Sequence, residues 1–150
     1  MIIDAKNLIV GRIGTFVAKK AILGEEIIII NSDQAMITGK KTKIFADYKQ
    51  RYNRGTFKGP FLPRRADYFL KRSIRGMIPY KKASGSEAFK RIKCFVGTPE
   101  SLKGKETQTI PNANISKMSN LNYVTVKEIC QYLGGKQWNQ LLLQEKEKVQ

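Results

Sequence analysis

The sequence predicts a single α/β domain that spans residues 1–150, and three observations support this prediction. A strand pattern followed by a helical pattern opens the chain, a continuous β-branched run comes next, and helical patterns recur further along. Because 41% of the 150 residues are hydrophobic, the chain can build a core. A domain of this length buries roughly 68–70% of the surface that its unfolded chain exposes. We therefore expect a fold that needs no disulfide bonds.

The first part of the chain predicts a βα unit followed by two more strands. Residues 2–5 form the first predicted strand, and the helix after it ends near Gly24. Apolar side chains recur in this helix at helical spacing: Ile13, Phe16, Val17 and Ala21. Ile27–Ile30 is β-branched throughout and is expected to be buried on both faces in a parallel sheet. Short strands are also predicted at 35–38 and 92–96, with helices covering the sheet.

Most of the positive charge lies in residues 40–93, which we call the basic segment. The chain has 28 Lys and Arg residues against 12 Asp and Glu residues, a net charge of +16. The basic segment contains 17 of these cations and three of the acids, which gives +14, whereas residues 1–39 are neutral and residues 94–150 carry +2. A compact body with so much like charge repels itself and usually binds a polyanion. Nucleic acid is therefore the predicted partner.

Two amphipathic helices are predicted within the basic segment. The first begins soon after Gly39, because apolar side chains recur at helical spacing: Ile44, Tyr48 and Tyr52.

A loop rich in glycine, proline and cations, 53–63, leads to a second helix at 65–77. One face of the second helix holds Leu70, Ile74 and Met77. The other face holds Arg65, Arg72 and Arg75. A merely solvated face would intersperse acids at i,i+4 spacing, and only Asp67 is available, so phosphate contact is favoured.

Aromatic side chains alternate with the cations of the basic segment and can stack on unpaired bases. They are Tyr48, Tyr52, Phe57, Phe61, Tyr68 and Tyr80. We expect most of them to fill the core and one or two at most to touch RNA.

A C-terminal helical extension is predicted at about 125–148. Thr125 and Glu128 form a capping-box pattern, which satisfies exposed amides at the start of a helix, and Gly134 can end that helix. A second amphipathic stretch begins with Trp138, Leu141 and Leu142. Core packing is the expected role of its apolar face, and docking on a neighbouring protein is the alternative.

The residue types exclude several kinds of site. The chain has no histidine, and Cys94 and Cys130 lack a C-x-x-C partner. The usual zinc ligands and every Ser-His or Cys-His nucleophile are therefore missing, and the scattered carboxylates offer no acid/base pair. We expect no metal, no cofactor and no small-molecule substrate. The longest apolar run, Ile27–Ile30, is too short to span a bilayer, and no signal-peptide pattern opens the chain, so we expect a cytoplasmic protein without a membrane partner.

Two glycine motifs resemble nucleotide-binding loops without matching them. Gly11-Arg12-Ile13-Gly14 lacks the first glycine of the dinucleotide fingerprint, where Ile9 stands, and the ribose-binding acid, where Asn31 stands. We interpret it as a tight turn, in which Arg12 can still grip an RNA phosphate as related loops of KH domains do. Gly39-Lys40 lacks the first glycine and the Mg²⁺-binding hydroxyl of a P-loop, so its lysines suit RNA phosphate better than a nucleotide.

Short blocks along residues 1–97 resemble the ribosomal protein L13 family of the large subunit. The blocks are Ile3-Asp4-Ala5, Gly11-Arg12, Ile29-Ile30-Asn31 with Asp33, Ile37-Thr38-Gly39-Lys40, Arg75-Gly76-Met77-Ile78-Pro79 and Ala88-Phe89-Lys90-Arg91-Ile92-Lys93. The last third, with Tyr132-Leu133-Gly134 and Trp138, is similar to the archaeal and eukaryotic branch. The resemblance implies a three-layer α/β/α fold with a four-stranded parallel sheet, into which the basic segment inserts a loop and helices.

The resemblance also implies a structural constituent of the large ribosomal subunit, located in the cytoplasm within the ribosome. Such a protein binds ribosomal RNA, contacts neighbouring ribosomal proteins, supports subunit assembly and catalyses no reaction. Bacterial members usually carry Gly-Arg where this chain has Gly85-Ser86, so we assign no RNA-contacting arginine to Ser86. An RNA-modifying or nucleotide-binding enzyme with a basic docking face is the alternative. The cations that we predict to contact RNA phosphates are Arg12, Lys40, Lys41, Lys43, Arg51, Arg54, Lys58, Arg64, Arg65, Arg72, Arg75, Lys81, Lys82, Lys90 and Arg91.

Overall fold

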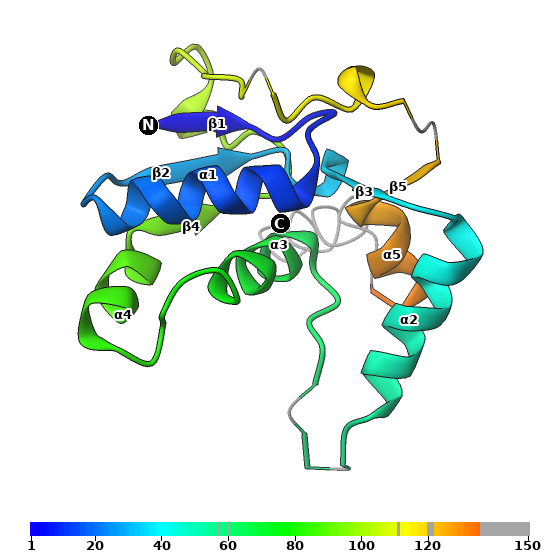
Figure 1. Ribbon diagram of the computed structural model, residues 1–150. Coiled ribbons are helices and arrows are strands. Elements are labelled where there is room, and N and C mark those ends of the chain that lie inside the picture. The colour runs from blue at the N-terminus through cyan, green and yellow to red at the C-terminus, as the bar shows by residue number, and fades with distance from the viewer. Residues whose placement is uncertain (57, 60, 111, 120–121, 136–150) are drawn as a thin grey trace, which may run out of the picture.

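The computed structural model describes residues 1–56, 58–59, 61–110, 112–119 and 122–135, and it confirms the α/β class (Figure 1). Strands β1 (Ile2–Asp4), β2 (Ile27–Ile30) and β4 (Ile92–Cys94) form a parallel sheet in the order β1-β2-β4. Helices α1 (Val10–Ile22), α3 (Ala66–Arg75) and α4 (Ala83–Lys90) each contact this sheet. Because α1 also contacts α3 and α4, the three helices pack on the sheet as one group.

The hydrophobic core lies between the parallel sheet and these helices. On the strands, Ile3 and Ile29 are adjacent in register and fully buried. On the helices, Ile13 of α1 and Leu70 and Ile74 of α3 are also fully buried. These positions belong to strands and helices that the sequence predicts from its hydrophobic patterns, whereas α4 was not predicted.

The strand predicted at 35–38 does not join the parallel sheet, so the prediction of four parallel strands is wrong. Instead, β3 (Met36–Thr38) pairs antiparallel with β5 (Tyr123–Thr125), a strand that we did not predict. The chain leaves the sheet after β2 because Asn31 adopts the left-handed conformation, with φ 54°, and the 3₁₀ helix η1 (Ser32–Gln34) follows at once. Asparagine is one of the few residues that tolerate this conformation.

Helix α1 begins at Val10, so Gly11 and Gly14 lie inside a helix and the tight-turn interpretation is wrong. Gly14 is required for close packing, since a Cβ atom there would lie 2.6 Å from the sulfur of Met77. Met77 itself follows α3, which ends at Arg75 with Gly76 as its C-cap residue. The predicted helix at 65–77 is therefore shorter than expected.

Helix α2 (Lys41–Asn53) and the following loop project away from the sheet as one arm-like unit (Figure 1). We call residues 40–65 the basic hairpin. Ile44 is buried and Tyr48 and Tyr52 are half-buried, which confirms the apolar face predicted for α2. At the tip, Thr56 and Gly59 pair with each other in an antiparallel bridge.

Helix α5 (Val126–Tyr132) supports the base of the basic hairpin. The Thr125 side chain accepts a hydrogen bond from the Glu128 amide at 3.2 Å, which confirms the predicted helix cap. α5 contacts both α2 and α3, and the ring of Tyr132 stacks on that of Phe45 with centroids 4.6 Å apart.

The amphipathic stretch predicted from Trp138 onward lies outside the described residues. Two further 3₁₀ helices, η2 (Glu100–Leu102) and η3 (Ile115–Lys117), interrupt the segment between β4 and β5.

Candidate nucleic-acid interface

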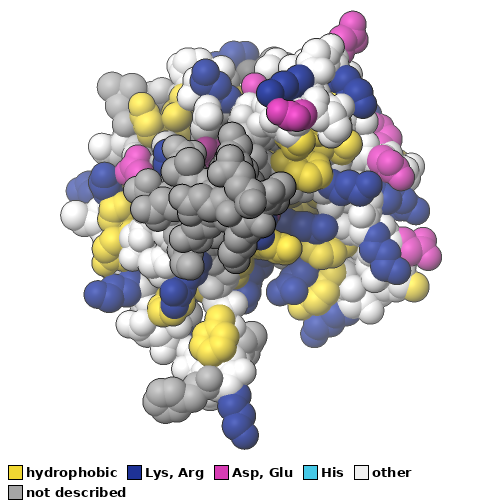
Figure 2. All heavy atoms as spheres, turned by 180° about the vertical axis from the view of Figure 1, so that it is seen from behind, with side chains coloured by type: hydrophobic (Ala, Val, Ile, Leu, Met, Phe, Trp, Pro, Cys, Tyr) yellow, Lys and Arg dark blue, Asp and Glu magenta, His cyan; other side chains and the backbone are white. Residues whose placement is uncertain are grey.

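All fifteen cations predicted to contact RNA reach the molecular surface. Arg72, Arg75 and Arg91 are half-buried, and the other twelve are exposed. Figure 2, seen from behind, shows that the hairpin projecting at the bottom of the view carries dark blue and yellow side chains, whereas magenta side chains lie higher on the body. Exposed positive charge therefore extends along the basic hairpin, where Asp47 is the only acidic residue of the described part. We call the fifteen cations together the basic surface.

The N-terminus of α2 concentrates positive charge. Lys40 is the N-cap residue, Lys41 and Lys43 lie in the first turn, and neither an acidic side chain nor a capping side chain is present there. The Lys41 ammonium lies 2.9 Å from the Glu128 carboxylate, and this hydrogen bond is the main reason that the pKa of Glu128 is lowered. Lys40 and Lys43 form no ion pair with a described residue. A positive helix end beside lysines attracts anions, so this helix end is a candidate phosphate contact.

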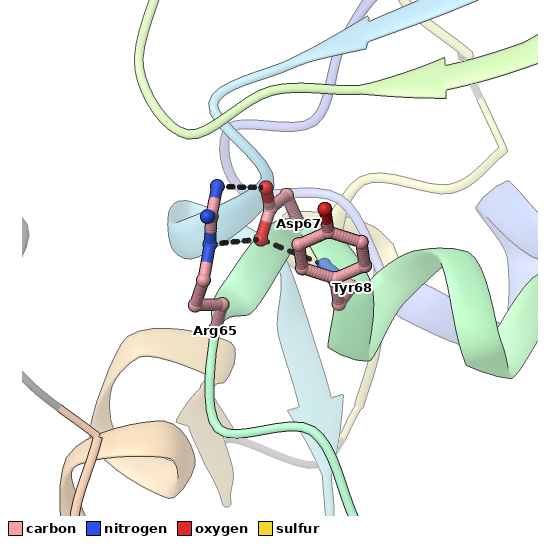
Figure 3. A network of polar contacts seen from close by, with 3 residues as sticks. All are labelled: Arg65, Asp67 and Tyr68. Atoms are coloured by element: carbon pink, nitrogen blue, oxygen red, sulfur yellow. Dashed lines mark hydrogen bonds and ion pairs between the residues drawn. The ribbon is translucent and has the colours of Figure 1, made fainter.

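The N-terminus of α3 is organised differently, because an acidic residue lies in its first turn (Figure 3). The Asp67 carboxylate accepts two hydrogen bonds from the Arg65 guanidinium, at 2.7 and 3.2 Å, and one from the Tyr68 amide at 2.8 Å. Arg65 also lies over the Tyr68 ring, 4.9 Å from its centroid. Because the carboxylate offsets its charge, Arg65 contributes less to the positive field than the neighbouring arginines do.

Three other arginines of the basic surface lie over tyrosine rings. The guanidinium carbon lies 5.2 Å from the ring centroid for Arg51 over Tyr48 and 4.8 Å for Arg64 over Tyr52. For Arg75 over Tyr80 the distance is 5.0 Å. A ring attracts a cation through its quadrupole without cancelling its charge. These arginines are therefore held in place while their charge remains available to an anion.

Three further arginines donate hydrogen bonds to carbonyl groups of the fold. Arg72 donates to the carbonyl of Phe61 at 3.1 Å, which ties α3 to the basic hairpin. Arg91 donates to the carbonyl of Ala21 at 3.3 Å. Arg12 donates to the carbonyl of Asn112 and also contacts the Met118 sulfur at 3.2 Å. Each of these side chains keeps further N–H groups, because a guanidinium carries five.

Arg12 lies apart from the basic hairpin, in a hollow of about 610 Å³ between α1 and residues 110, 112, 113 and 117. Lys19 and Lys117 line the same hollow, and the sequence gives no signal that brings them beside Arg12. The remaining cations of the basic surface project into solvent, and their side chains make no hydrogen bond or ion pair within the described part of the chain. They are Arg54, Lys58, Lys81, Lys82 and Lys90.

The expectation that most aromatic side chains of the basic segment fill the core is wrong. Phe61, Tyr68 and Tyr80 are 60%, 56% and 42% exposed. Of the described members of this set, Tyr48 and Tyr52 pack against the core, and both are half-buried. Phe57 lies outside the described residues. Burial raises the pKa of Tyr48, which keeps this phenol neutral beside Arg51.

The two thiols have none of the properties of a reactive site. Burial raises the pKa of Cys94 and of Cys130 to about 12, so both are protonated at neutral pH. Among the residues that the structure describes, no three His, Cys, Asp or Glu side chains come together in a way that could hold a metal ion. The described helices also include none with the length and apolar character needed to cross a membrane.

Comparison with known proteins identifies a family. The family model described as ribosomal protein L13 matches residues 1–101. The large ribosomal subunit protein uL13 of Archaeoglobus fulgidus is 42% identical, and the match covers 89% of this chain and 86% of that protein. The protein of the same name from Methanosarcina barkeri is also 42% identical, over 90% of this chain and 98% of that protein. The one from Halobacterium salinarum is 35% identical, over 90% and 91%.

Proposed function

The chain belongs to the ribosomal protein L13 family, and from this premise we propose that it is a structural constituent of the large ribosomal subunit that binds ribosomal RNA through its basic surface. Its relatives are named as large-subunit proteins, and the archaeal ones match nearly the whole chain. The proposal includes a location in the cytoplasm within the ribosome, contacts with neighbouring large-subunit proteins, and a part in subunit assembly.

The observation that carries this proposal is a basic surface whose cations are held in place but are mostly not neutralised. Within the described residues, carboxylates lie within ion-pair distance of three of the fifteen, namely Lys41, Arg65 and Arg91. A free protein with so many uncompensated charges repels itself, and a sugar-phosphate backbone supplies the missing countercharge. Nucleic acid is the anion whose repeating charge matches an extended surface of this kind.

The basic surface binds RNA by neutralising several backbone phosphates at once. Each phosphate that a lysine or arginine neutralises releases condensed counterions, and this release drives association. Recognition depends on the shape of the folded RNA more than on its sequence, because the deep major groove of an A-form helix excludes side chains. Arginines at bidentate contacts contribute most, since a guanidinium can donate two parallel hydrogen bonds to one phosphate.

The chemistry of the described hollows favours binding over catalysis. The described residues that line the hollow beside Arg12 and a second one at the tip of the basic hairpin include no Asp or Glu. The high pKa of each thiol also makes Cys94 and Cys130 poor nucleophiles. We therefore propose no catalytic role.

Binding to purified large-subunit ribosomal RNA as a function of salt tests the proposal. If about eight phosphates are neutralised, the logarithm of the affinity should fall with the logarithm of salt concentration with a slope of roughly −6 to −7. Replacing Lys81, Lys82 and Lys90 with glutamine should make this slope less steep by about 2–3, because three charges are lost. The protein should also sediment with large subunits at moderate salt.

A matched control comes from two lysines outside the basic surface. Lys103 and Lys105 are exposed and follow η2, so the variant Lys103→Gln with Lys105→Gln should keep the original slope. A slope near zero for the unchanged protein would refute RNA binding through charge. Saturable binding of nucleotides or methyl donors would instead support an RNA-modifying enzyme.

A further inference from the structure

A hollow of about 500 Å³ opens at the tip of the basic hairpin. Tyr52 and Asn53 at the end of α2, Gly55 and Thr56 in the turn, and Phe61 on the returning arm line it. Ligand pockets in proteins typically measure roughly 300–1,000 Å³. The hollow is therefore large enough for a flat group such as a nucleobase.

Aromatic rings from the two arms of the hairpin line this hollow. Phe61 is 60% exposed, so a large apolar ring faces water in the free protein. Tyr52 is half-buried, packs against the core, and has the Arg64 guanidinium over its ring at 4.8 Å. Stacking on such rings is the main way in which proteins hold unpaired bases, and every base has a face that can stack.

Hydrogen bonds within the turn and to α3 hold parts of the wall of the hollow. The Phe61 carbonyl accepts a hydrogen bond from Arg72 at 3.1 Å, which anchors the returning arm to α3. In the turn, the Thr56 hydroxyl donates to the Gly59 carbonyl at 2.9 Å, and the Gly59 amide donates to the Thr56 carbonyl at 2.9 Å. Gly59 has φ 96°, a conformation that favours glycine. A site formed in advance pays less to order its side chains when it binds.

Charge around the hollow selects the kind of molecule that can enter. Between Asp47 and Asp67 the chain has no acidic residue, whereas it has six cations. They are Lys49, Arg51, Arg54, Lys58, Arg64 and Arg65. An apolar ligand without negative charge gains nothing from these cations. A base attached to a sugar-phosphate strand suits both the aromatic lining and the cations, because its ring stacks in the hollow while its flanking phosphates lie near the cations.

We propose that the hollow at the hairpin tip binds one unpaired nucleobase of an RNA strand, which stacks on Phe61, while Tyr52, whose ring lies beneath Arg64 and packs against the core, forms a wall of the hollow. Asn53 lines the hollow, and its side-chain amide can both donate and accept a hydrogen bond at the edge of the base. This inference rests on the proposed function, since RNA is the partner in both. It adds that the hairpin recognises a bulge or loop, where a base is free to leave the stack, and not only the phosphates of a paired helix.

Two short RNA hairpins test the inference on the full chain. They are identical except that one carries a single bulged nucleotide, made as the fluorescent base 2-aminopurine. We expect the unchanged protein to bind the bulged RNA about tenfold more tightly than the paired RNA, and to quench the fluorescence of the bulged base by stacking. Phe61→Ala should remove this tenfold preference and the quenching. It should leave the salt dependence unchanged, because no charge is lost.

Two variants separate stacking from folding. Phe61→Trp keeps an aromatic face and should retain the preference for the bulged RNA. Tyr68→Ala removes another exposed ring of the same surface, 56% exposed but outside the hollow, and should leave the preference intact. The inference is overturned if Phe61→Ala keeps the preference for the bulged RNA, or if it weakens binding of both RNAs by the same factor. A flat salt dependence of the unchanged protein would instead refute the proposed function.

Discussion

Removing the charge of Lys40 and Lys43 is predicted to stabilise the free protein and, at the same time, to weaken its binding to RNA. Both lysines lie at the N-terminus of α2, where the helix already carries partial positive charge. The nearby acid, Glu128, pairs with Lys41 at 2.9 Å. In the free protein, Lys40 and Lys43 therefore lower the stability of the fold. A phosphate bound at this helix end would attract both lysines, so their charge would stabilise the complex.

The size of both effects follows from these positions. A cation at a helix N-terminus costs about 0.3–1 kcal/mol at low ionic strength, so the variant Lys40→Gln with Lys43→Gln should gain roughly 0.6–2 kcal/mol. For a chain of this length that gain corresponds to a rise in Tm of roughly 1–8 °C. If each lysine contacts one phosphate, the slope of the salt dependence should become less steep by about 1.4–1.8.

Thermal unfolding followed by circular dichroism, at low and at high salt, measures the first effect, and filter binding to large-subunit ribosomal RNA measures the second. The gain in Tm should shrink at high salt, because ions screen exposed charges. The control variant Lys103→Gln with Lys105→Gln should leave the salt dependence of RNA binding unchanged. A lower Tm for the Lys40 and Lys43 variant at low salt, or RNA binding that equals that of the unchanged protein, would refute this account of the helix end.

Further predictions concern the core, the thiols and the helix cap. Leu70→Ala should cost ~2–5 kcal/mol in chemical denaturation because Leu70 is fully buried, whereas Leu23→Ala, at a 70% exposed position, should change stability by under about 0.5 kcal/mol. At pH 8 the thiolate fraction of Cys94 and Cys130 should be about a thousandfold lower in the folded protein than in the unfolded chain. Both thiols should therefore be alkylated much more slowly in native buffer than in denaturant. Alkylation rates within tenfold of each other would contradict this prediction. Glu128→Gln should lower the free energy of unfolding by about 0.2–1 kcal/mol at pH 7, because it removes the ion pair with Lys41. Because the pKa of Glu128 is lowered on folding, this difference should disappear as the pH falls below its ordinary value of 4.5, and a difference that persisted in acid would rule out the ion pair as its cause.

Most of the core could be predicted from the sequence, because hydrophobic periodicity depends only on neighbouring residues. The parallel pairing of β1, β2 and β4 and the stripe of α1 agree with that prediction. The pairing of β3 with β5 could not be predicted, since Met36 and Thr125 meet only after the chain between them has folded. Local patterns carry no information about such distant partners.

Helix α4 was missed for a different reason. Its first residues, Ala83-Ser84-Gly85-Ser86, include a glycine and two serines, which are weak helix formers. Gly85 is required by packing, because a Cβ atom there would lie 2.2 Å from the carbonyl oxygen of Pro79. Tertiary packing therefore requires glycine at position 85. The low helix propensity of glycine argues against a helix there when only the local sequence is considered. Lys81 and Lys82 precede this helix and Lys90 is its last residue, so their placement also depends on an element that the sequence did not reveal.

Charge counting located the candidate interface, but it could not tell which cations are already engaged. The sequence predicts Arg12 in a tight turn, whereas the structure places it in α1, where it donates a hydrogen bond to the carbonyl of Asn112. Arg72 was assigned to a phosphate-facing side of α3, and it also anchors Phe61 of the hairpin. Such contacts join residues far apart along the chain, so a composition or a spacing cannot predict them.

The way in which the arginines are held explains how one surface can be both ordered and strongly positive. A carboxylate partner fixes a guanidinium but cancels its charge, as Asp67 does for Arg65. Tyrosine rings hold Arg51, Arg64 and Arg75 without that loss, because a ring carries no net charge. Restricting these long side chains before binding reduces the entropy that RNA binding must overcome. These tyrosine rings thus take the place that acidic residues hold on an ordinary charged surface, and this substitution preserves the attraction for phosphate.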